Sequence, residues 1–454
     1  MRPLRDGPPR DVPPRDINVT ALIDDRPLSP LQWLVFVLCS LAAFLDGADS
    51  QSIGVAAPLI ATGFGMPMGS FAPAFSAGLL GATIGALTFG PLGDRFGRKR
   101  MLIVAVLLLS VFTLLTAVAR TFPELLAIRF LGGLGLGGAT PCFITLCAEY
   151  TPRRRRAMLA SVLWAAYPLG ASLGGVVNAT VIPALGWQAV FYIGGGLPLL
   201  VAVLMAFLLP ESLSYLVARG GSSSQAQSIV RKLDKTLAGQ DMRLLANTET
   251  PVKVSLGSLF TEGRATGTIF LWLIFFMAFG TTTVIVLLTP TLFRGSGLPL
   301  SAAALMVGLN NFVGVAGMAS AGRLVERFGP LVLVPAFVLG AAILAILGSV
   351  ATSVALSAVC MALLGVTVLL GASGGIALAA TSYPTAIRST GVGWAMGMGR
   401  LGQVCSPLLV GAMLKGGWGA PRILGVMALL PVLAGLFVLL RTLQSRRAGL
   451  TVAV

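Results

Sequence analysis

The chain has 454 residues, of which 56% are hydrophobic and only 11% are charged, and its formal net charge is +16. Soluble domains carry about 25% charged residues, so this composition excludes an ordinary soluble protein. It predicts an all-α integral membrane protein, because open sheets leave backbone groups unpaired in lipid. The chain has no histidine, which excludes histidine-based catalysis and proton relays, and none of its five cysteines has metal-binding spacing.

Residues 1–30 are rich in proline, arginine and aspartate and have no apolar core, so we predict a disordered cytoplasmic tail. Apolar segments of about 20 residues follow, and each is long enough to cross a bilayer. The twelve predicted spans cover residues 31–59, 70–92, 101–119, 124–148, 158–181, 188–209, 267–292, 301–322, 331–350, 354–380, 389–414 and 422–441.

A long polar interval at residues 210–266 divides the spans into two halves of six, residues 31–209 and residues 267–441. The interval contains a glycine–serine run at residues 220–224, so we predict a flexible and partly helical linker. Residues 442–454 form a second predicted tail.

The basic residues fix the predicted orientation. Most of them lie on the side that holds the linker and both tails, and this asymmetry indicates membrane topology rather than nucleic-acid binding. By the positive-inside rule, both termini are cytoplasmic, and we expect a multi-pass protein of the plasma (inner) membrane. The opposite side has only Arg120, Arg294, Lys415 and Arg422.

Two segments with the same pattern mark an internal repeat. Residues 90–97 read GPLGDRFG and residues 322–329 read GRLVERFG, at an offset of 232. Tyr150 and Tyr383, each in the loop after the fourth span of its half, lie 233 residues apart. The halves are therefore predicted to be parallel six-helix repeats, an architecture that places the substrate site between them near the bilayer midplane.

The first of these loops resembles a known signature. Residues 90–100, GPLGDRFGRKR, resemble the motif between helices two and three of the major facilitator superfamily, and residues 129–137 and 210–212 are similar to two further motifs of that superfamily. The resemblance covers essentially the whole chain and implies twelve helices in two pseudo-symmetric halves. The sequence departs from the pattern at Ser214, where PES-x-R has arginine, and at Glu326, which replaces aspartate.

Within that superfamily, the chain resembles the aromatic acid:proton symporters. The first span contains Asp46-Gly-Ala-Asp49, similar to the D-G-x-D motif of that branch, and residues 383–394 and 399–402 resemble the branch as well. Members take benzoate-, hydroxybenzoate- or phenylpropionate-type anions inward with protons. The resemblance implies a transporter rather than an enzyme, with the proton gradient as energy source and no cofactor.

Few ionisable groups lie inside the predicted spans, where each costs about 2.5–3.5 kcal/mol to insert. Asp46 and Asp49 share one helix face, and repulsion between their charges favours a proton on at least one of them. We predict that one or both carry the coupled proton; the alternative is a hydrogen bond to a neighbouring helix. The second half has Ala278 and Thr281 at the same offset, so the acids break the repeat.

Arg129 and Arg400 are the cations inside the predicted spans, and a guanidinium presents a planar fork that matches a carboxylate. Arg400 is predicted to bind the substrate anion, with a structural ion pair as the alternative. Arg129 is predicted either to bind the substrate or to pair with Asp46 or Asp49. Aromatic and amide side chains in the spans are further substrate-binding candidates, with helix packing as the alternative. They are Trp164, Tyr167, Asn178, Phe279, Asn310, Asn311, Trp394 and Gln403.

Charged residues at the cytoplasmic rim form the last group of candidates. The resemblance implies that they form the charge network that locks the outward-open state, and we expect Glu149 to pair with Arg98. The alternative is a cluster that only anchors the loops. Four arginines at residues 153–156 are also placed to bind anionic lipid head groups. The gating candidates are Asp94, Arg95, Arg98, Glu149, Glu326, Arg327 and Arg388.

These features predict a secondary transporter that takes up an aromatic or related organic acid anion with protons by alternating access. The alternative within the same fold is a proton-coupled exporter or importer of another small metabolite or drug. A membrane receptor or enzyme is a third class, but the chain has no nucleophile–base set, nucleotide loop or metal-ligand cluster. The expected partners are a small organic anion, protons and membrane lipids, without nucleic acid, and the expected state is a monomer.

Overall fold

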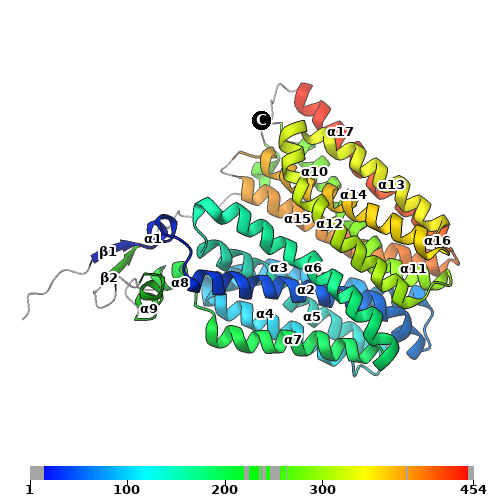
Figure 1. Cartoon of the computed structure of the whole chain (residues 1–454). Coiled ribbons are helices and arrows are strands. Elements are labelled where there is room, and N and C mark those ends of the chain that lie inside the picture. The colour runs from blue at the N-terminus through cyan, green and yellow to red at the C-terminus, as the bar shows by residue number, and fades with distance from the viewer. Residues whose placement is uncertain are drawn as a thin grey trace, which may run out of the picture.

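A computed structural model describes residues 15–218, 224–234, 237, 242–245, 256–261, 263–384 and 387–447 (Figure 1). In that part of the chain, all elements except two short strands are helical. Residues 1–14 of the first predicted tail (1–30) and residues 448–454 of the second (442–454) lie outside the described residues, as does most of the glycine–serine run, at residues 220–223.

The first half is a bundle of six long helices that match the six predicted spans. Two of them begin with a capping box, formed by Ser29 with Gln32 and by Thr121 with Glu124, which satisfies the free backbone N–H groups at a helix start. The helices are α2 (Pro30–Gly63), α3 (Ala72–Phe96) after the 3₁₀ turn η1 (Met68–Phe71), α4 (Arg98–Thr116), α5 (Phe122–Glu149), α6 (Arg153–Leu185) and α7 (Trp187–Leu208).

The second half is a second bundle, in which the first and last spans are interrupted. The first is α10 (Ala265–Thr283), which passes through the π-helical turn η4 (Val284–Leu288) into α11 (Thr289–Gly295). The other helices are α12 (Leu300–Phe328), α13 (Leu333–Ser349) after η5 (Pro330–Val332), α14 (Val354–Ser382), α15 (Arg388–Lys415), and α16 (Ala420–Met427) with α17 (Leu429–Arg447).

Eleven helical segments among the described residues are long and apolar enough to cross a membrane. The twelfth predicted span is α15, whose 28 residues reach about 42 Å at a rise of 1.5 Å per residue. This helix is not among the eleven, and it carries Arg388, Arg400, Lys415 and several glycines. The prediction of an all-α membrane protein with twelve spans is therefore confirmed.

Glycines in the fourth span let α5 pack closely against α3. A Cβ atom on Gly133 would lie 2.1 Å from the carbonyl oxygen of Gly78, and one on Gly137 would lie 1.8 Å from that of Ala82. A larger side chain at either position would force the two helices apart. This close packing also places the guanidinium of Arg129, one turn before Gly133, beside Gly78 of α3.

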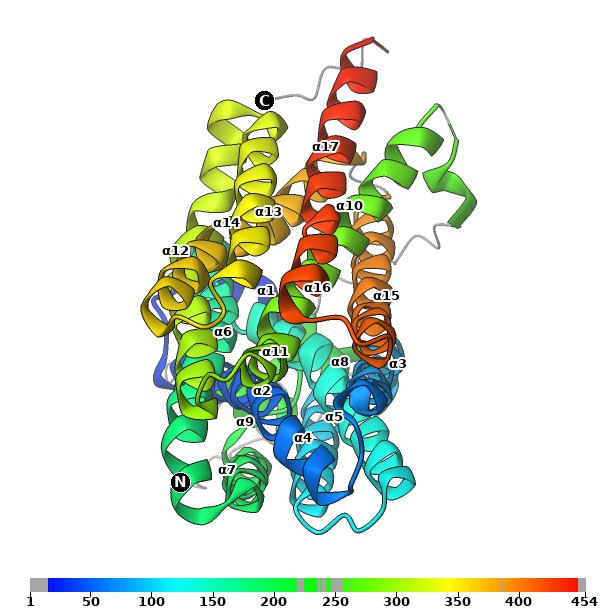
Figure 2. The same ribbon diagram turned by 90° about the vertical axis from the view of Figure 1, so that its right-hand side faces the viewer.

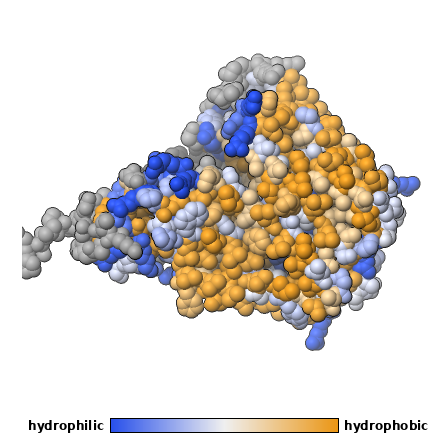
Figure 3. Space-filling view, viewed as in Figure 1, coloured by the Kyte–Doolittle hydropathy of each residue, from blue (hydrophilic) through white to orange (hydrophobic). Residues whose placement is uncertain are grey.

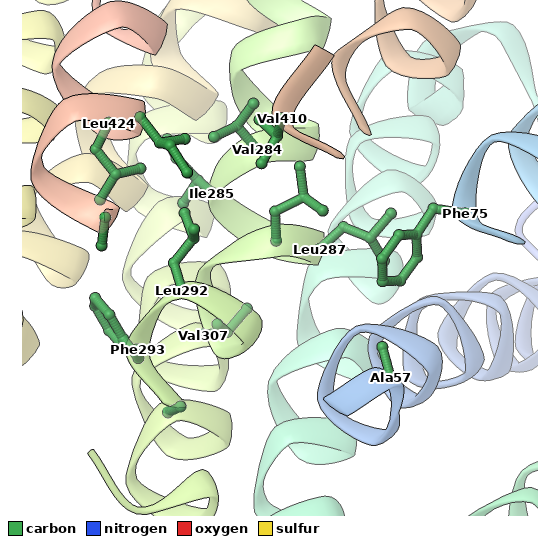
Figure 4. Packing of buried hydrophobic residues seen from close by; sticks show 14 of the residues in the cluster. Ala57, Phe75, Val284, Ile285, Leu287, Leu292, Phe293, Val307, Val410 and Leu424 are labelled. Atoms are coloured by element: carbon green, nitrogen blue, oxygen red, sulfur yellow. The ribbon is translucent and has the colours of Figure 1, made fainter. Parts of the chain in front are cut away.

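The two halves meet at the end of the molecule opposite the linker, which we call the far end. The end that carries the linker and both described chain ends is the linker end (Figure 1). An apolar cluster at the far end joins Ala57 and Phe75 of the first half to Val284, Leu287 and Val410 of the second (Figure 4). Figure 2 looks onto this end, where α11 contacts α2 and α15 contacts α3.

Polar contacts and close backbone contacts between the halves also lie toward the far end. Ser76 Oγ of α3 donates a hydrogen bond to the carbonyl oxygen of Val404 at 2.8 Å. A Cβ atom on Gly54 of α2 would lie 2.9 Å from the carbonyl oxygen of Leu287. Toward the linker end, by contrast, the buried clusters of the two halves share no described residue, and the bundles diverge in Figure 1. Among the described residues, the buried apolar contacts between the two halves are therefore concentrated at the far end, which is closed.

Part of the segment that we predicted to be a disordered tail is folded. β1 (Arg15–Asn18) pairs in parallel with β2 (Met242–Leu245) of the linker, and α1 (Val19–Asp25) follows it. The linker also forms α8 (Leu213–Ala218), α9 (Ser224–Leu233) and η3 (Leu256–Leu259). The tail differs from the prediction because its few apolar side chains are buried by residues of the linker and of the first half that lie far away in the sequence, which no local pattern indicates.

The tail also connects the linker to the first half. Ile17, Val19 and Ile23 lie in the same buried cluster as residues of the linker and of α2, α4 and α5. Arg26 forms an ion pair with Asp234 of the linker at 2.7 Å. Asp24 accepts a hydrogen bond from the backbone N–H of Arg153 at the start of α6, at 2.7 Å. The described parts of α9 and β2 are thus attached to the first half.

The surface of both bundles is apolar. On the face seen in Figure 3, hydrophobic residues cover both bundles, most hydrophilic residues gather at the linker end, and a few lie at the opposite end. Large apolar side chains such as Leu87, Leu185 and Phe207 are more than two-thirds exposed. A continuous exposed apolar surface of this kind is a liability in water, whereas lipid chains cover it in a membrane.

Candidate functional site

Two acidic residues lie near the middle of α2 and are almost completely buried, with 5% of Asp46 and 1% of Asp49 exposed. Gly47 between them brings α2 against α6, because a Cβ atom there would lie 2.0 Å from the carbonyl oxygen of Tyr167. The two carboxylates have different surroundings, although they are only three residues apart.

The carboxylate of Asp49 lies among helices of the first half. Thr113 of α4 donates a hydrogen bond from its hydroxyl to Asp49 Oδ1 at 2.9 Å. Arg129 of α5 is close enough for its charge to act on Asp49. Neither Asp49 Oδ2 nor Arg129 Nε has a hydrogen-bond partner among the described residues. Arg129 is therefore placed beside Asp49, one of the two partners that the sequence left open for it.

Asp46 lies beside the second half of the protein. The charge of Arg400 on α15 acts on it, and so does the charge of Asp49. Tyr167 belongs to the same group, because the charges of Asp46 and Arg400 both act on its hydroxyl. We call Asp46, Asp49, Arg129, Tyr167 and Arg400 the central site.

Arg400 is half-buried, and Gln403 lies one turn further along α15. The Arg400 Nη1 atom donates a hydrogen bond to Gln403 Oε1 at 3.4 Å. Close packing on α10 sets the position of this turn, because a Cβ atom on Gly402 would lie 2.1 Å from the carbonyl oxygen of Phe276. Gln403 thus joins the central site through Arg400.

The other predicted substrate-binding residues have different surroundings. The side-chain amide of Asn310 donates to the carbonyl oxygen of Met361 at 2.8 Å, which ties α12 to α14. That of Asn311 donates to the carbonyl oxygen of Val307 on its own helix at 2.9 Å. Both amide nitrogens therefore have partners within the second half. Trp164 lies half-buried on α6, one turn before Tyr167.

Some polar residues around the site were not among the predicted ones. Thr113 contacts Asp49 directly, but threonine is so common in apolar helices that no pattern in the sequence points to it. Gln51 is fully buried, and neither atom of its amide has a partner among the described residues. Both side-chain amide atoms of Asn178 on α6 are also buried without a hydrogen-bond partner among the described residues. Among the described residues, no cluster of three or more potential metal ligands occurs.

At the linker end of the first half, several predicted gating residues contact one another. Arg98 forms an ion pair with Asp94 at 2.9 Å and another with Glu149, the expected partner. Glu149 also accepts a hydrogen bond from the hydroxyl of Ser212 at 2.6 Å. The end of α3, the start of α4, the end of α5 and the segment after α7 are therefore joined through one arginine and one glutamate.

Glu211, which was not predicted as a site residue, caps α4 from a distant segment. Its Oε1 atom accepts from the backbone N–H of Lys99 at 2.9 Å. Gly97 makes room for this carboxylate, because its φ is +104° and a Cβ atom would lie 2.5 Å from Glu211 Oε2. The hydroxyl of Tyr150 donates to the carbonyl oxygen of Glu211 at 2.7 Å, and burial together with Glu211 raises the pKa of Tyr150.

The rim of the second half keeps only part of this arrangement. Arg95 and Arg327 occupy equivalent places, each with its guanidinium over the ring of the following phenylalanine, at 5.3 Å and 5.4 Å from the ring centroid. Arg388 Nε donates to the carbonyl oxygen of Tyr383 at 3.5 Å, and Glu326 is exposed. Ser382 corresponds to Glu149 at the repeat offset of 233. Its hydroxyl oxygen instead accepts a hydrogen bond from Arg441 at 2.6 Å. The two rims are therefore not equivalent.

Comparison with known proteins identifies the fold and its relatives. The Major Facilitator Superfamily model matches residues 39–368 and 271–451 of the chain. The 4-hydroxybenzoate transporter PcaK of Pseudomonas aeruginosa is 37% identical, over 94% of this chain and 96% of that protein. The gallate transporter of Pseudomonas putida is 36% identical, over 93% of this chain and 94% of that protein.

Solved structures show the same fold. A D-xylose–proton symporter matches with a TM-score of 0.72 at 20% identity, over 89% of this chain and 97% of that chain. An inward-facing bacterial homologue of the human lysosomal transporter Spinster matches with a TM-score of 0.67 at 16% identity, over 91% of this chain and 97% of that chain. The matched family and these relatives consist of transporters rather than enzymes. With twelve spans, two six-helix halves and relatives that align over nearly its whole length, the chain belongs to the major facilitator superfamily.

Proposed function

We propose that the protein takes up an aromatic or related organic acid anion together with protons, by alternating access of the central site. The observation that carries the proposal is the position of Asp46 in the first half beside Arg400 in the second. A permanent cation at the boundary suits a carboxylate, and a buried acid beside it suits a proton. The names of the relatives, which transport 4-hydroxybenzoate and gallate, support this substrate class.

In this proposal, Arg400 binds the carboxylate of the substrate. Tyr167 and Trp164 on α6 supply aromatic rings at one side, and Gln403 supplies an amide next to Arg400. Aromatic rings favour offset or edge-to-face contacts with a ring substrate. Proton coupling is supported by the buried acids and by the likeness in fold to a D-xylose–proton symporter. The proton gradient supplies the energy, and no cofactor is needed.

We also propose an orientation and a conformational state. The excess of basic residues at the linker end favours a cytoplasmic position for it and for both termini, in the inner membrane of a bacterium. The far end is then periplasmic, and the structure is inward-facing. The cluster of Arg98, Asp94 and Glu149 is proposed to meet the second half when the linker end closes. One chain supplies both sides of the central site, so a monomer is sufficient.

The test is uptake by intact bacterial cells that express the protein and have no transporter of their own for aromatic acids. We expect labelled 4-hydroxybenzoate or gallate to accumulate above the external concentration, more strongly in an acidic medium, and to be lost when a protonophore is added. Expressed at the same level, the Arg400→Ala variant should show only background uptake. The neutral 4-hydroxybenzamide should not compete.

The same experiment separates the proposal from its alternative. A proton-coupled exporter would lower the cellular content of its substrate below that of control cells, and the protonophore would raise it. If expressing cells accumulate none of a panel of aromatic acids under any imposed pH gradient, the uptake proposal is wrong.

A further inference from the structure

The partners of Asp49 all belong to one half of the protein. Thr113 of α4 donates to Asp49 Oδ1 at 2.9 Å, and the charge of Arg129 of α5 acts on the same carboxylate. On a third side, a Cβ atom on Gly194 of α7 would lie 3.9 Å from Oδ1. Since α2, α4, α5 and α7 form one bundle, these groups move together with Asp49 when the halves rotate against each other.

Asp46 lies one turn earlier and is within reach of a charge in the other half. Arg400 of α15 is the cation whose charge acts on it. Its Oδ1 atom has no hydrogen-bond partner among the described residues, although only 5% of Asp46 is exposed. Any rotation of one bundle against the other changes the distance from Asp46 to Arg400, whereas the distance from Asp49 to Arg129 stays the same.

We propose that the two aspartates have different roles: Asp46 takes up and releases the coupled proton, whereas Thr113 and Arg129 hold Asp49 in a fixed cluster that positions α2. The inference rests on the proposed function and assigns a separate role to each of the two acids. Asp49, Thr113 and Arg129 are then positioning residues.

The physical reason is that coupling needs a group whose surroundings change during the transport cycle. A counter-charge that stays at a constant distance makes the same contribution to a carboxylate's preference for its proton in every state, so it does not link that preference to substrate binding. A carboxylate whose counter-charge is on the other half, and is also shared with the substrate, changes that preference as the substrate binds and the halves move. The charged and titratable groups that act on Asp46 are Arg400 of α15, Asp49 of α2 and Tyr167 of α6.

The balance of charge follows from this division. When the far end is open, Asp46 takes a proton from water on that side and the substrate carboxylate occupies Arg400. After the far end closes, the substrate leaves at the linker end and Asp46 gives its proton to water on that side. Asp46, now ionised, again faces Arg400. One anion and one proton cross together, and Arg400 is neutralised in each state.

The first test compares Asp46→Asn with Asp49→Asn in two assays, accumulation against a gradient and counterflow exchange. Asp46→Asn should lower accumulation at least about tenfold, the ratio that 1.4 kcal/mol gives, and should abolish its dependence on external pH, while counterflow continues. Asp49→Asn should slow both assays but keep the pH profile, because the oxygen of asparagine can still accept from Thr113.

The second test is rescue by a neutral pair. Asp49→Asn leaves the buried charge of Arg129 without its carboxylate, and adding Arg129→Gln removes that charge. The double variant should therefore transport several-fold faster than Asp49→Asn alone and keep its pH dependence. The matched combination of Asp46→Asn with Arg400→Gln should not recover accumulation.

A milder pair of variants covers the case in which Asp49→Asn does not reach the membrane. Thr113→Val removes the hydroxyl that binds Asp49, and Thr113→Ser keeps it. We expect Thr113→Val to transport more slowly with an unchanged pH profile, and Thr113→Ser to resemble the wild type.

The proposal is overturned if Asp46→Asn still accumulates substrate in response to a pH gradient. It is equally overturned if Asp49→Asn with Arg129→Gln retains counterflow but loses pH-driven accumulation, or if Thr113→Val shifts the pH profile. Failure of the underlying function looks different, because the wild type itself would then accumulate no aromatic acid.

Discussion

Arg400 is the residue that we propose binds the charged group of the substrate. A permanent charge midway along a span must be neutralised by an anion or hydrated by water, since an isolated guanidinium in lipid is unfavourable by about 2.5–3.5 kcal/mol. The described contacts of Arg400 are one long hydrogen bond to Gln403 and the nearby charge of Asp46. Its guanidinium therefore keeps donors available for a second anion.

The first prediction concerns the planar shape of the Arg400 guanidinium. Arg400→Lys keeps the positive charge but loses the planar fork that binds a carboxylate with two hydrogen bonds. We expect the apparent KM for the acid substrate to rise about tenfold, or about 1.4 kcal/mol, while protein levels in the membrane stay constant. Uptake kinetics at several substrate concentrations measure it. An unchanged KM would mean that Arg400 does not bind the carboxylate.

Single residues differ in how well the sequence reveals them. Asp46, Asp49, Arg129 and Arg400 could be predicted because charged side chains inside apolar spans are rare and unfavourable, and the structure brings these four together in the central site. Buried amides carry a weaker signal. Those of Asn310 and Asn311 need partners as well, but backbone carbonyl groups of the second half satisfy them. Thr113 could not be predicted, because its role depends on a contact between α4 and α2.

At the scale of helices, the start of α4 shows how one element depends on a distant segment. Gly97 precedes α4 and supplies no side-chain cap, so the free N–H groups of the first turn need another acceptor. Glu211, more than one hundred residues later, supplies it through the N–H of Lys99. A carboxylate at a helix N-terminus also interacts favourably with the helix dipole.

The second prediction follows from this capping. In Gly97→Ala, the new Cβ atom would lie 2.5 Å from Glu211 Oε2 and the backbone would keep a φ of +104°. Such strain costs about 1–3 kcal/mol, so we expect a lower Tm of the purified protein and slower uptake. Gly63→Ala is the matched control, since nothing lies within 4 Å of a Cβ atom there. Equal melting of both variants would show that Glu211 moves aside and that the backbone leaves this φ at no cost.

Helices and strands also differ in predictability. The twelve spans could be placed to within a few residues because apolar length is a local property of the sequence. The pairing of β1 with β2 could not, because two strands of four residues gain their stability from a partner far away in the chain. The cap that Glu211 provides was missed for the same reason, although residues 210–212 had been identified as a motif.

For the whole molecule, the position of the contacts between the halves defines the state. The far-end cluster contains residues of α2 and α3 together with residues of η4, α11 and α15, and it is apolar throughout. To expose the central site at the far end, the protein must separate these surfaces. A change confined to this interface should therefore alter the balance between the two states without touching the central site.

The last prediction uses Gly411 of α15 for that purpose. A Cβ atom on Gly411 would lie 2.4 Å from that of Ala72 on α3, so the indole of Gly411→Trp cannot fit while the far end is closed. We expect this variant to favour the far-end-open state and to lose uptake, although it inserts into the membrane. A cysteine in place of Ser76, which lies 6% exposed at this interface, should then react faster with a membrane-impermeant maleimide in a background without the native cysteines. Gly196→Trp is the control, because nothing lies within 4 Å of a Cβ atom at that position of α7. If labelling at residue 76 is the same in both tryptophan variants, closure at Gly411 is not what holds the far end shut.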